Sequence, residues 1–245
     1  MLHNNSVIEI AGLQFAWKKQ AKPVLNIESL QVNHGDRVFL RGPSGCGKST
    51  LLSLLAGVSI PQSGVLKVLG QDLSQLGNAQ RDQFRADHIG FIFQMFNLIP
   101  YLSVVENVTL PCLFSSKRKL KVLAQADSLG QEAIRLLGHL DMADTDILQK
   151  PVNELSVGQQ QRVAAARALI GAPELVIADE PTSSLDADRR MAFIDLLFRE
   201  CDDTNATLVF VSHDNSLEAP FQRTIEFPRI NSISSDVRPK LRAVS

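Results

Sequence analysis

The most specific chemistry in the chain belongs to nine consecutive residues, Gly42-Pro43-Ser44-Gly45-Cys46-Gly47-Lys48-Ser49-Thr50. They match the pattern G-x-x-x-x-G-K-[ST] at every fixed position, which predicts a loop that holds nucleotide phosphates. The three glycines let successive backbone N–H groups turn toward one point, and the helix start that follows adds unsatisfied donors. Lys48 is placed to contact the β- and γ-phosphates, and Ser49 to ligate Mg²⁺. An ordinary glycine turn that caps a helix is the alternative.

Two adjacent carboxylates follow a buried apolar run. Asp179 and Glu180 come directly after Leu175-Val176-Ile177-Ala178. We expect Asp179 to hold Mg²⁺ through water and Glu180 to accept the proton of an attacking water molecule. Because side chains alternate along an extended chain, the two carboxylates should point in different directions. A helix N-cap followed by a turn is the alternative.

Further polar residues end two other apolar runs. His213 follows the run Thr207-Leu208-Val209-Phe210-Val211, and Gln94 ends the predicted strand over residues 88–94. Sites in parallel sheets lie at the carboxyl ends of the strands, so these residues belong to the same edge as Gly42 and Asp179. We expect His213 to bind the γ-phosphate or position the water, although a lone histidine is more often structural.

A second anion-binding helix start is predicted at Ser156. Ser156 and Gln159 form an S-x-x-Q capping box at the head of an alanine-rich helix, with Gly158 between them. The loop around Lys48 already has its own helix, so this second head has no obvious phosphate to bind within one subunit. A second copy of the chain, related by a two-fold axis, would supply one.

The elements that must position these residues fall into three regions. Residues 7–32 alternate loosely between apolar and polar, as half-buried antiparallel strands do. The near-continuous apolar runs after residue 156 alternate with helices and predict a parallel α/β sheet. Residues 94–155 read as an inserted helical region that contains the basic run Lys117-Arg118-Lys119-Leu120-Lys121. We expect this run to be a solvated surface loop; contact with a lipid surface or a partner is the alternative.

Composition excludes several classes of protein. The 245 residues carry a net charge of −1, which gives no electrostatic reason to expect nucleic-acid binding. Three cysteines, at positions 46, 112 and 201, argue against a disulfide framework and for a reducing compartment. We find neither a secretion signal nor a run of about 18 apolar residues. We therefore expect a cytoplasmic protein, and any transport role would need a separate membrane partner.

The order of these motifs, from residue 7 to residue 228, resembles that of the ATP-binding cassette ATPases. The resemblance implies an α/β fold of the P-loop NTPase (RecA-like) type. Such a fold has a parallel core sheet, an N-terminal antiparallel β subdomain and an inserted α-helical subdomain, here at about residues 95–160. Residues 229–245 would form a C-terminal tail. The family also implies ATP and Mg²⁺ as cofactors, and a head-to-tail dimer that sandwiches two ATP molecules.

The resemblance also implies a role for individual residues. Trp17 matches the aromatic residue that stacks on adenine, Gln94 the glutamine that couples the metal site to the membrane partner, and Asp186 the loop aspartate at the dimer interface. The implied catalytic residues are Glu180, His213, Gln94 and Lys48, and the implied metal ligands are Ser49, Gln94 and Asp179. The implied nucleotide contacts are Trp17, Gly42, Pro43, Ser44, Gly45, Cys46, Gly47, Lys48, Ser49, Thr50, Ser156, Gly158, Gln159 and Asp186.

Two features depart from the family pattern. Val157 replaces the first glycine of the common signature LSGGQ, while Ser156, Gly158 and Gln159 are retained. Residues 215–231 lack the Asp-Gly-like turn that is usual after the histidine. We expect activity to survive the first departure, and the second leaves the terminal fold open.

Residues 90–100 and 106–111 are similar to the subgroup that works with lipoprotein-releasing and macrolide-exporting permeases. This implies an integral-membrane permease as partner and a peripheral position on the cytoplasmic face of the inner membrane. The apolar residues after Gln94 would form part of the groove for a permease helix, with core packing as the alternative. They are Phe96, Leu98, Ile99 and Tyr101.

Other families share the same motifs. The cell-division ATPase of the same subgroup stays open as an alternative. DNA-repair ATPases separate the two halves of the site by a very long coiled coil, and ribosome-associated cassette proteins carry two cassettes in one chain. Both are disfavoured here because the chain is short and has one phosphate loop.

Overall fold

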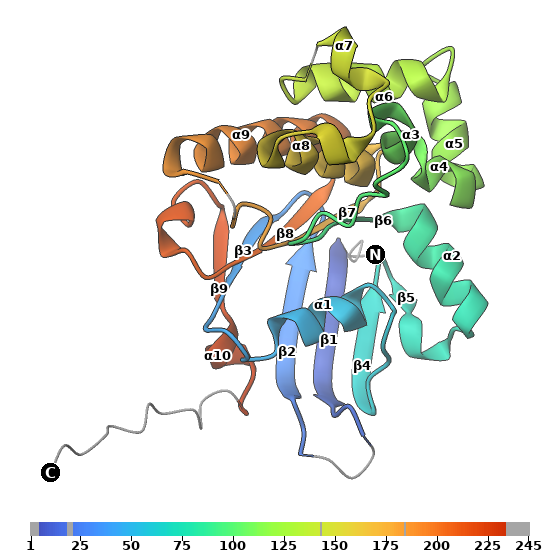
Figure 1. Ribbon diagram of the computed structural model, residues 1–245. Helices are drawn as coiled ribbons and strands as arrows, with labels where there is room; N and C mark the ends of the chain where they lie inside the picture. The colour runs from blue at the N-terminus through green and yellow to red at the C-terminus, as the bar shows by residue number, and fades with distance from the viewer. Residues whose placement is uncertain (1–4, 19–21, 143, 184, 234–245) are drawn as a thin grey trace, which may run out of the picture.

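The computed structural model describes residues 5–18, 22–142, 144–183 and 185–233. Within these ranges the chain forms two sheets, with the helix that follows the phosphate loop between them and a group of helices beyond the second sheet (Figure 1). The predicted α/β fold with a parallel core sheet, an antiparallel β region and a helical insertion is confirmed. Ser184 and residues 234–245, which include most of the predicted tail, lie outside the described residues.

The first sheet is antiparallel and has the strand order β2-β1-β4-β5. Its strands are β1 (Ser6–Phe15), β2 (Leu25–Asn33), β4 (Ser63–Val68) and β5 (Gln71–Asp72). The predicted alternation over residues 7–32 is present as β1 and β2, which pair from Ile8 with Val32 to Phe15 with Leu25. One face of this sheet packs on α1 (Lys48–Leu55).

The second sheet is parallel and has the order β6-β7-β8-β3-β9. Its strands are β3 (Arg37–Arg41), β6 (Ile89–Ile92), β7 (Leu175–Asp179), β8 (Thr207–Ser212) and β9 (Arg223–Glu226). Successive side chains of β7 alternate between two cores: Leu175 and Ile177 face α1, while Val176 and Ala178 face the helices. Burial on both faces explains the continuous apolar runs in the sequence. Strand β6 ends two residues before Gln94, so the strand predicted over residues 88–94 is shorter than expected.

Helices cover the other face of the parallel sheet, with the helical insertion beyond them (Figure 1). The two long helices α8 (Val157–Leu169) and α9 (Ala187–Thr204) pack on the sheet. The insertion contains α3 (Val104–Thr109), α4 (Pro111–Phe114), α5 (Ser116–Leu123), α6 (Leu129–His139) and α7 (Thr145–Leu148). Helix α2 (Asn78–His88) leads into β6, and three short 3-10 turns span Leu73–Gln75, Val152–Glu154 and Asn215–Leu217.

The basic run at residues 117–121 is not the solvated loop that the sequence predicts, but most of helix α5. Arg118 is 1% exposed and donates hydrogen bonds to the carbonyls of Ile89, Ala168 and Ile170. Gly171 makes room for it, because a Cβ there would lie 2.6 Å from the Arg118 Cβ. The high charge of this run does not indicate a solvated loop here, because the buried Arg118 attaches the helical insertion to the core.

The region after His213 is ordered without an Asp-Gly-like turn. The chain runs through β9, which pairs in parallel with β3, into the short helix α10 (Phe227–Ile230). Asn231 then forms an isolated bridge with Ile27 of β2. The end of the described chain is therefore tied to both sheets.

Candidate functional site

The carboxyl edge of the parallel sheet opens into a cavity of about 740 Å³, which we call the Lys48 cavity. It collects residues from five separate segments of the chain. Its lining is Trp17, Val24, Pro43, Ser44, Gly45, Gly47, Lys48, Ser49, Thr50, Gln94, Asp179, Glu180 and His213. Of the residues predicted for this half of the site, all but Gly42 and Cys46 line the cavity, because β3, β6, β7 and β8 end at the same edge.

The phosphate loop has the backbone conformation that its glycines permit. Gly47 precedes α1 with φ of 106°, and a Cβ at this position would lie 2.9 Å from Leu25, so only glycine fits without strain. Lys48 is 9% exposed, and its Nζ donates to the carbonyls of Gly42 and Pro43 at 2.6 and 3.0 Å. The ammonium group is thereby folded back over its own loop.

Ser49 and Asp179 face each other across the cavity. The Ser49 hydroxyl donates to Oδ2 of Asp179 at 3.4 Å, which joins the start of α1 to the end of β7. Burial, and then the neighbouring Glu180 charge, raise the pKa of Asp179, while Ser49 and Lys48 oppose the rise. A hydroxyl and a carboxylate, with the Gln94 amide in the same cavity, are oxygen ligands of the kind that Mg²⁺ prefers. The residues present therefore fit this cation.

Glu180 is fixed by two neighbours from the end of β8. Its Oε1 lies 2.9 Å from Nδ1 of His213, and its Oε2 accepts from the Ser212 hydroxyl at 3.3 Å. The separation from Asp179 does not arise from strand alternation, as the sequence suggests, because β7 ends at Asp179 and Glu180 has φ of 48°. This left-handed turn is uncommon for a side chain other than glycine and directs the carboxylate toward His213.

Trp17 lies beyond the end of β1 and is 62% exposed, whereas Phe15, two residues earlier, is buried. The two rings meet edge to face with their centroids 5.1 Å apart. The core therefore holds Phe15 and leaves Trp17 on the wall of the Lys48 cavity, available for a flat ligand.

The signature residues do not lie in the Lys48 cavity. Ser156, Gly158 and Gln159 line a separate cavity of about 330 Å³, the Ser156 cavity, together with Leu185 and Arg189. The predicted capping box is present: the Ser156 hydroxyl accepts from the backbone N–H of Gln159, and the Gln159 side-chain oxygen accepts from the backbone N–H of Ser156.

Two more residues mark this surface. Gln161, at the base of the Ser156 cavity, is fully buried, and both of its amide atoms lack a hydrogen-bond partner in the described structure. Asp186 caps the start of α9 and accepts from the Arg189 amide. The predicted nucleotide contacts of one chain thus line two separate cavities.

Some residues of the Lys48 cavity escaped the sequence analysis. Val24 lines the wall, yet an apolar residue gives no motif. The segment from Glu226 to Ser232 lies behind the loop: Phe227 is packed against Gly42 and Gly47. Because residues 215–231 lack the usual Asp-Gly-like turn, the sequence offered no motif that would place this segment at the site.

Comparison with known proteins agrees with this geometry. The family described as "ABC transporter" matches residues 25–183. A lipoprotein-releasing system ATP-binding protein, LolD, of Buchnera aphidicola is 37% identical over 87% of this chain and 90% of its own length. The macrolide export ATP-binding/permease protein MacB of Photorhabdus laumondii is 35% identical over 91% of this chain, which spans only 33% of that relative.

Solved structures give the same assignment of the fold. The ATP-binding cassette MJ0796, in a dimeric post-hydrolysis state bound to ADP and Pi, matches with a TM-score of 0.77 and 31% identity over 89% of this chain and 93% of that chain. None of the helices in the described ranges has both the length and the apolar character needed to cross a lipid bilayer.

Proposed function

The chain belongs to the ABC transporter family, and from this premise we propose that it is the ATP-hydrolysing subunit of a transporter of the lipoprotein-release or macrolide-export type. ATP binding closes a dimer of two such subunits, and hydrolysis reopens it and moves a separate membrane permease. The observation that carries the proposal is the division of one site between two surfaces, with Lys48 on one and Ser156 on the other.

Several residues that line the Lys48 cavity would contact ATP. The N–H groups of the loop and the start of α1 surround the phosphates, and Lys48 supplies a positive charge that is already desolvated. Trp17 offers an exposed ring for the adenine. Ser49, Asp179 and Gln94 would hold Mg²⁺, which neutralises charge on the transferred phosphoryl group when it is bound.

Glu180 has the surroundings of a general base. It is largely buried and has its two oxygens directed by Ser212 and His213. A carboxylate held in this way can take the proton from a water molecule in line with the γ-phosphate. His213 keeps the carboxylate in place and is itself exposed enough to reach the same phosphate.

The second copy of the chain completes the site. The head of α8 presents the Ser156 hydroxyl, the Gly158 backbone and a positive dipole end, but within its own subunit no phosphate loop is near. A head-to-tail dimer places this helix head on the partner's nucleotide. The buried side-chain amide of Gln161 has no hydrogen-bond partner in the described structure, and such an amide costs about 1–3 kcal/mol. This cost supports a rearrangement of the surface when two subunits assemble.

A groove of about 560 Å³ between α2, β6 and α4 is the proposed permease contact, and we call it the Phe114 groove. Its apolar wall includes Phe91, Phe93, Pro111 and Phe114, of which Phe114 is 68% exposed. Exposed apolar surface of this kind fits an amphipathic helix. The residues that the sequence suggested for this groove do not line it: Phe96 is buried in the core, Leu98 packs against the core, and Ile99 and Tyr101 lie outside the groove.

We place the subunit on the cytoplasmic face of the inner membrane, bound through this groove. The names of the two relatives connect LolD with lipoprotein release and MacB with macrolide export. We propose that the permease selects the transported substrate, which can belong to either class. The ATPase unit is proposed to span residues 7–228, with the helical subdomain at about 95–160. The cell-division ATPase of the same subgroup is the alternative; no specific contact favours it.

Two experiments test the proposal. Phosphate release by the purified chain should require Mg²⁺ and should fall to background in Lys48→Ala; equal activity in both would refute the site.

A photo-crosslinking residue at Phe114 should capture one integral-membrane protein in membranes, while the same residue at Val58, also exposed and apolar, should not. Identical crosslinks from both positions would refute the groove.

A further inference from the structure

The segment Glu226 to Ser232 lies directly beneath the phosphate loop. Phe227 is fully buried there. A Cβ built on Gly42 would lie 3.2 Å from Phe227 and 3.3 Å from Pro228, and one on Gly47 would lie 3.4 Å from Phe227. The floor of the loop is therefore made by residues about 180 positions later in the chain.

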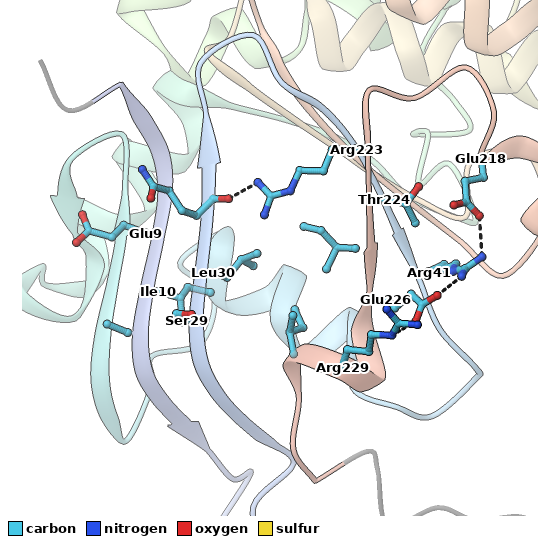
Figure 2. Close-up of a pocket in the computed structure, with 14 residues that line it drawn as sticks. Glu9, Ile10, Ser29, Leu30, Arg41, Glu218, Arg223, Thr224, Glu226 and Arg229 are labelled. Carbon is cyan, nitrogen blue, oxygen red and sulfur yellow. Dashed lines mark hydrogen bonds and ion pairs between the residues drawn. The ribbon is translucent and has the colours of Figure 1, made fainter.

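Ion pairs fix the entry to the loop from the same segment. Arg41, the last residue of β3 and the neighbour of Gly42, binds Glu218 at 2.7 Å and also pairs with Glu226, which is joined in turn to Arg229. Figure 2 shows these side chains in a row along one wall of a cavity of about 710 Å³ between β2 and β9. The end of β3 is thus attached to β9 through side chains as well as through the sheet.

Asn231 makes the contact that reaches into the loop itself. It is fully buried, and its Nδ2 donates to the carbonyls of Val24 and Cys46 at 3.0 and 3.2 Å. Its Oδ1 accepts from the backbone N–H of Asn26 at 2.9 Å. One side-chain amide therefore ties the beginning of β2 to the middle of the phosphate loop.

The bond to Cys46 has a geometric consequence for Gly47. The Cys46 carbonyl and the Gly47 N–H belong to one planar trans peptide group, so they point in opposite directions. Asn231 draws the carbonyl oxygen downward, away from the cavity, and this turns the Gly47 N–H toward the Lys48 cavity, which Gly47 lines. Gly47 has no Cβ and φ of 106°, a backbone conformation that glycine adopts readily, so a bond to the Cys46 carbonyl helps to set the orientation of this peptide.

We propose that Asn231 is a positioning residue for the nucleotide site: it holds the Cys46–Gly47 peptide with its N–H toward the phosphates. The C-terminal segment is then part of the site's support, and it takes the place of the turn that the family usually has after the histidine. The inference rests on the proposed function, since the phosphate in question is that of ATP.

The test compares Asn231→Ala with the wild type in ATP binding, turnover and thiol reactivity. We expect the dissociation constant for ATP to rise about tenfold, as the loss of one well-directed hydrogen bond would give. Turnover at saturating ATP should change less than about twofold, because Glu180 and His213 are untouched. Alkylation of Cys46 without nucleotide should become several times faster, since its carbonyl is released.

Asn26→Ala is the matched control. It removes the 2.8 Å bond from the Asn26 side chain to Ser232, at the same segment, without touching the loop. Its ATP affinity and Cys46 reactivity should equal those of the wild type.

A purely structural Asn231 would lower the melting temperature of the Ala variant but leave ATP affinity and Cys46 reactivity unchanged, which would overturn the inference. If Asn231→Ala does not fold, Asn231→Leu, which has nearly the same shape but no donor, decides by the same measurements. A wild type that does not bind ATP would instead overturn the proposed function, whereas the alkylation arm needs no nucleotide.

Discussion

Nδ1 of His213 lies 2.9 Å from Oε1 of Glu180, and this contact joins the ends of β8 and β7 at the edge where β3 ends and the phosphate loop begins. The carboxylate is 13% exposed and the imidazole 67%, so the histidine is the outer member of the pair.

Glu180→Gln should bind ATP but lose turnover by at least about a hundredfold, because an amide cannot accept the proton of the attacking water. Because the bound ATP is not cleaved, the dimeric form should accumulate, and size-exclusion chromatography with and without ATP will detect it. Hydrolysis at the wild-type rate would show that another group is the base.

Adding Ser156→Arg to Glu180→Gln should abolish the ATP-dependent dimer and leave ATP binding by the monomer intact, since the Arg blocks the head of α8. Ser128→Arg is the matched control, because Ser128 caps α6 in the same way and lies in the helical insertion. A dimer that persists with Ser156→Arg would place the second half-site elsewhere.

Alkylation under native conditions should modify Cys46 selectively and stop ATP hydrolysis. Cys112 and Cys201 are buried, and burial raises the pKa of both thiols, that of Cys201 to about 12. ATP should protect Cys46, and peptide mapping by mass spectrometry will show the site. A Cys46→Ser variant that is equally sensitive would contradict this assignment.

Arg118→Met should lower the free energy of unfolding by about 2 kcal/mol, because three backbone carbonyls lose a buried donor. Burial lowers the pKa of Arg118 to about 10, yet the guanidinium stays charged at neutral pH. Urea denaturation measures the effect. Lys119→Ala, exposed on the same helix, should change stability by less than about 0.5 kcal/mol.

Glu174→Gln should destabilise the protein by about 1 kcal/mol at pH 7 and less at acid pH. Burial opposes the charge of Glu174, but hydrogen bonds from His88 and Lys117 and the charge of Lys121 outweigh it and lower the pKa of this carboxyl. A lowered carboxyl pKa stabilises the fold above the unfolded pKa of about 4.3, and this contribution is lost as pH falls below it.

In urea titrations, the difference in stability between wild type and Glu174→Gln should therefore be smaller at pH 3.5 than at pH 7, because the contribution falls from the unfolded pKa downward and is lost fully only below the lowered folded pKa. Glu28→Gln, at an exposed position, should show no such difference at either pH. A constant difference between wild type and Glu174→Gln at both pH values would contradict the assignment.

The sequence by itself determined much of the catalytic edge. The phosphate-loop pattern, the carboxylates after β7 and the capping box at Ser156 are local, because short-range backbone chemistry demands those residue types at those spacings. Apolar runs likewise predicted the parallel sheet, since strands buried on both faces leave no other pattern.

Tertiary structure alone decided the contacts between distant segments. The basic run became a helix with a buried Arg118 because carbonyls from β6 and the end of α8 surround it. Glu180 turns toward His213 through a left-handed residue that its type does not favour. Asn231 reaches Cys46 across 185 positions. Each depends on where the backbone of another segment lies, which no local pattern encodes, whereas the phosphate loop carries its chemistry within nine residues.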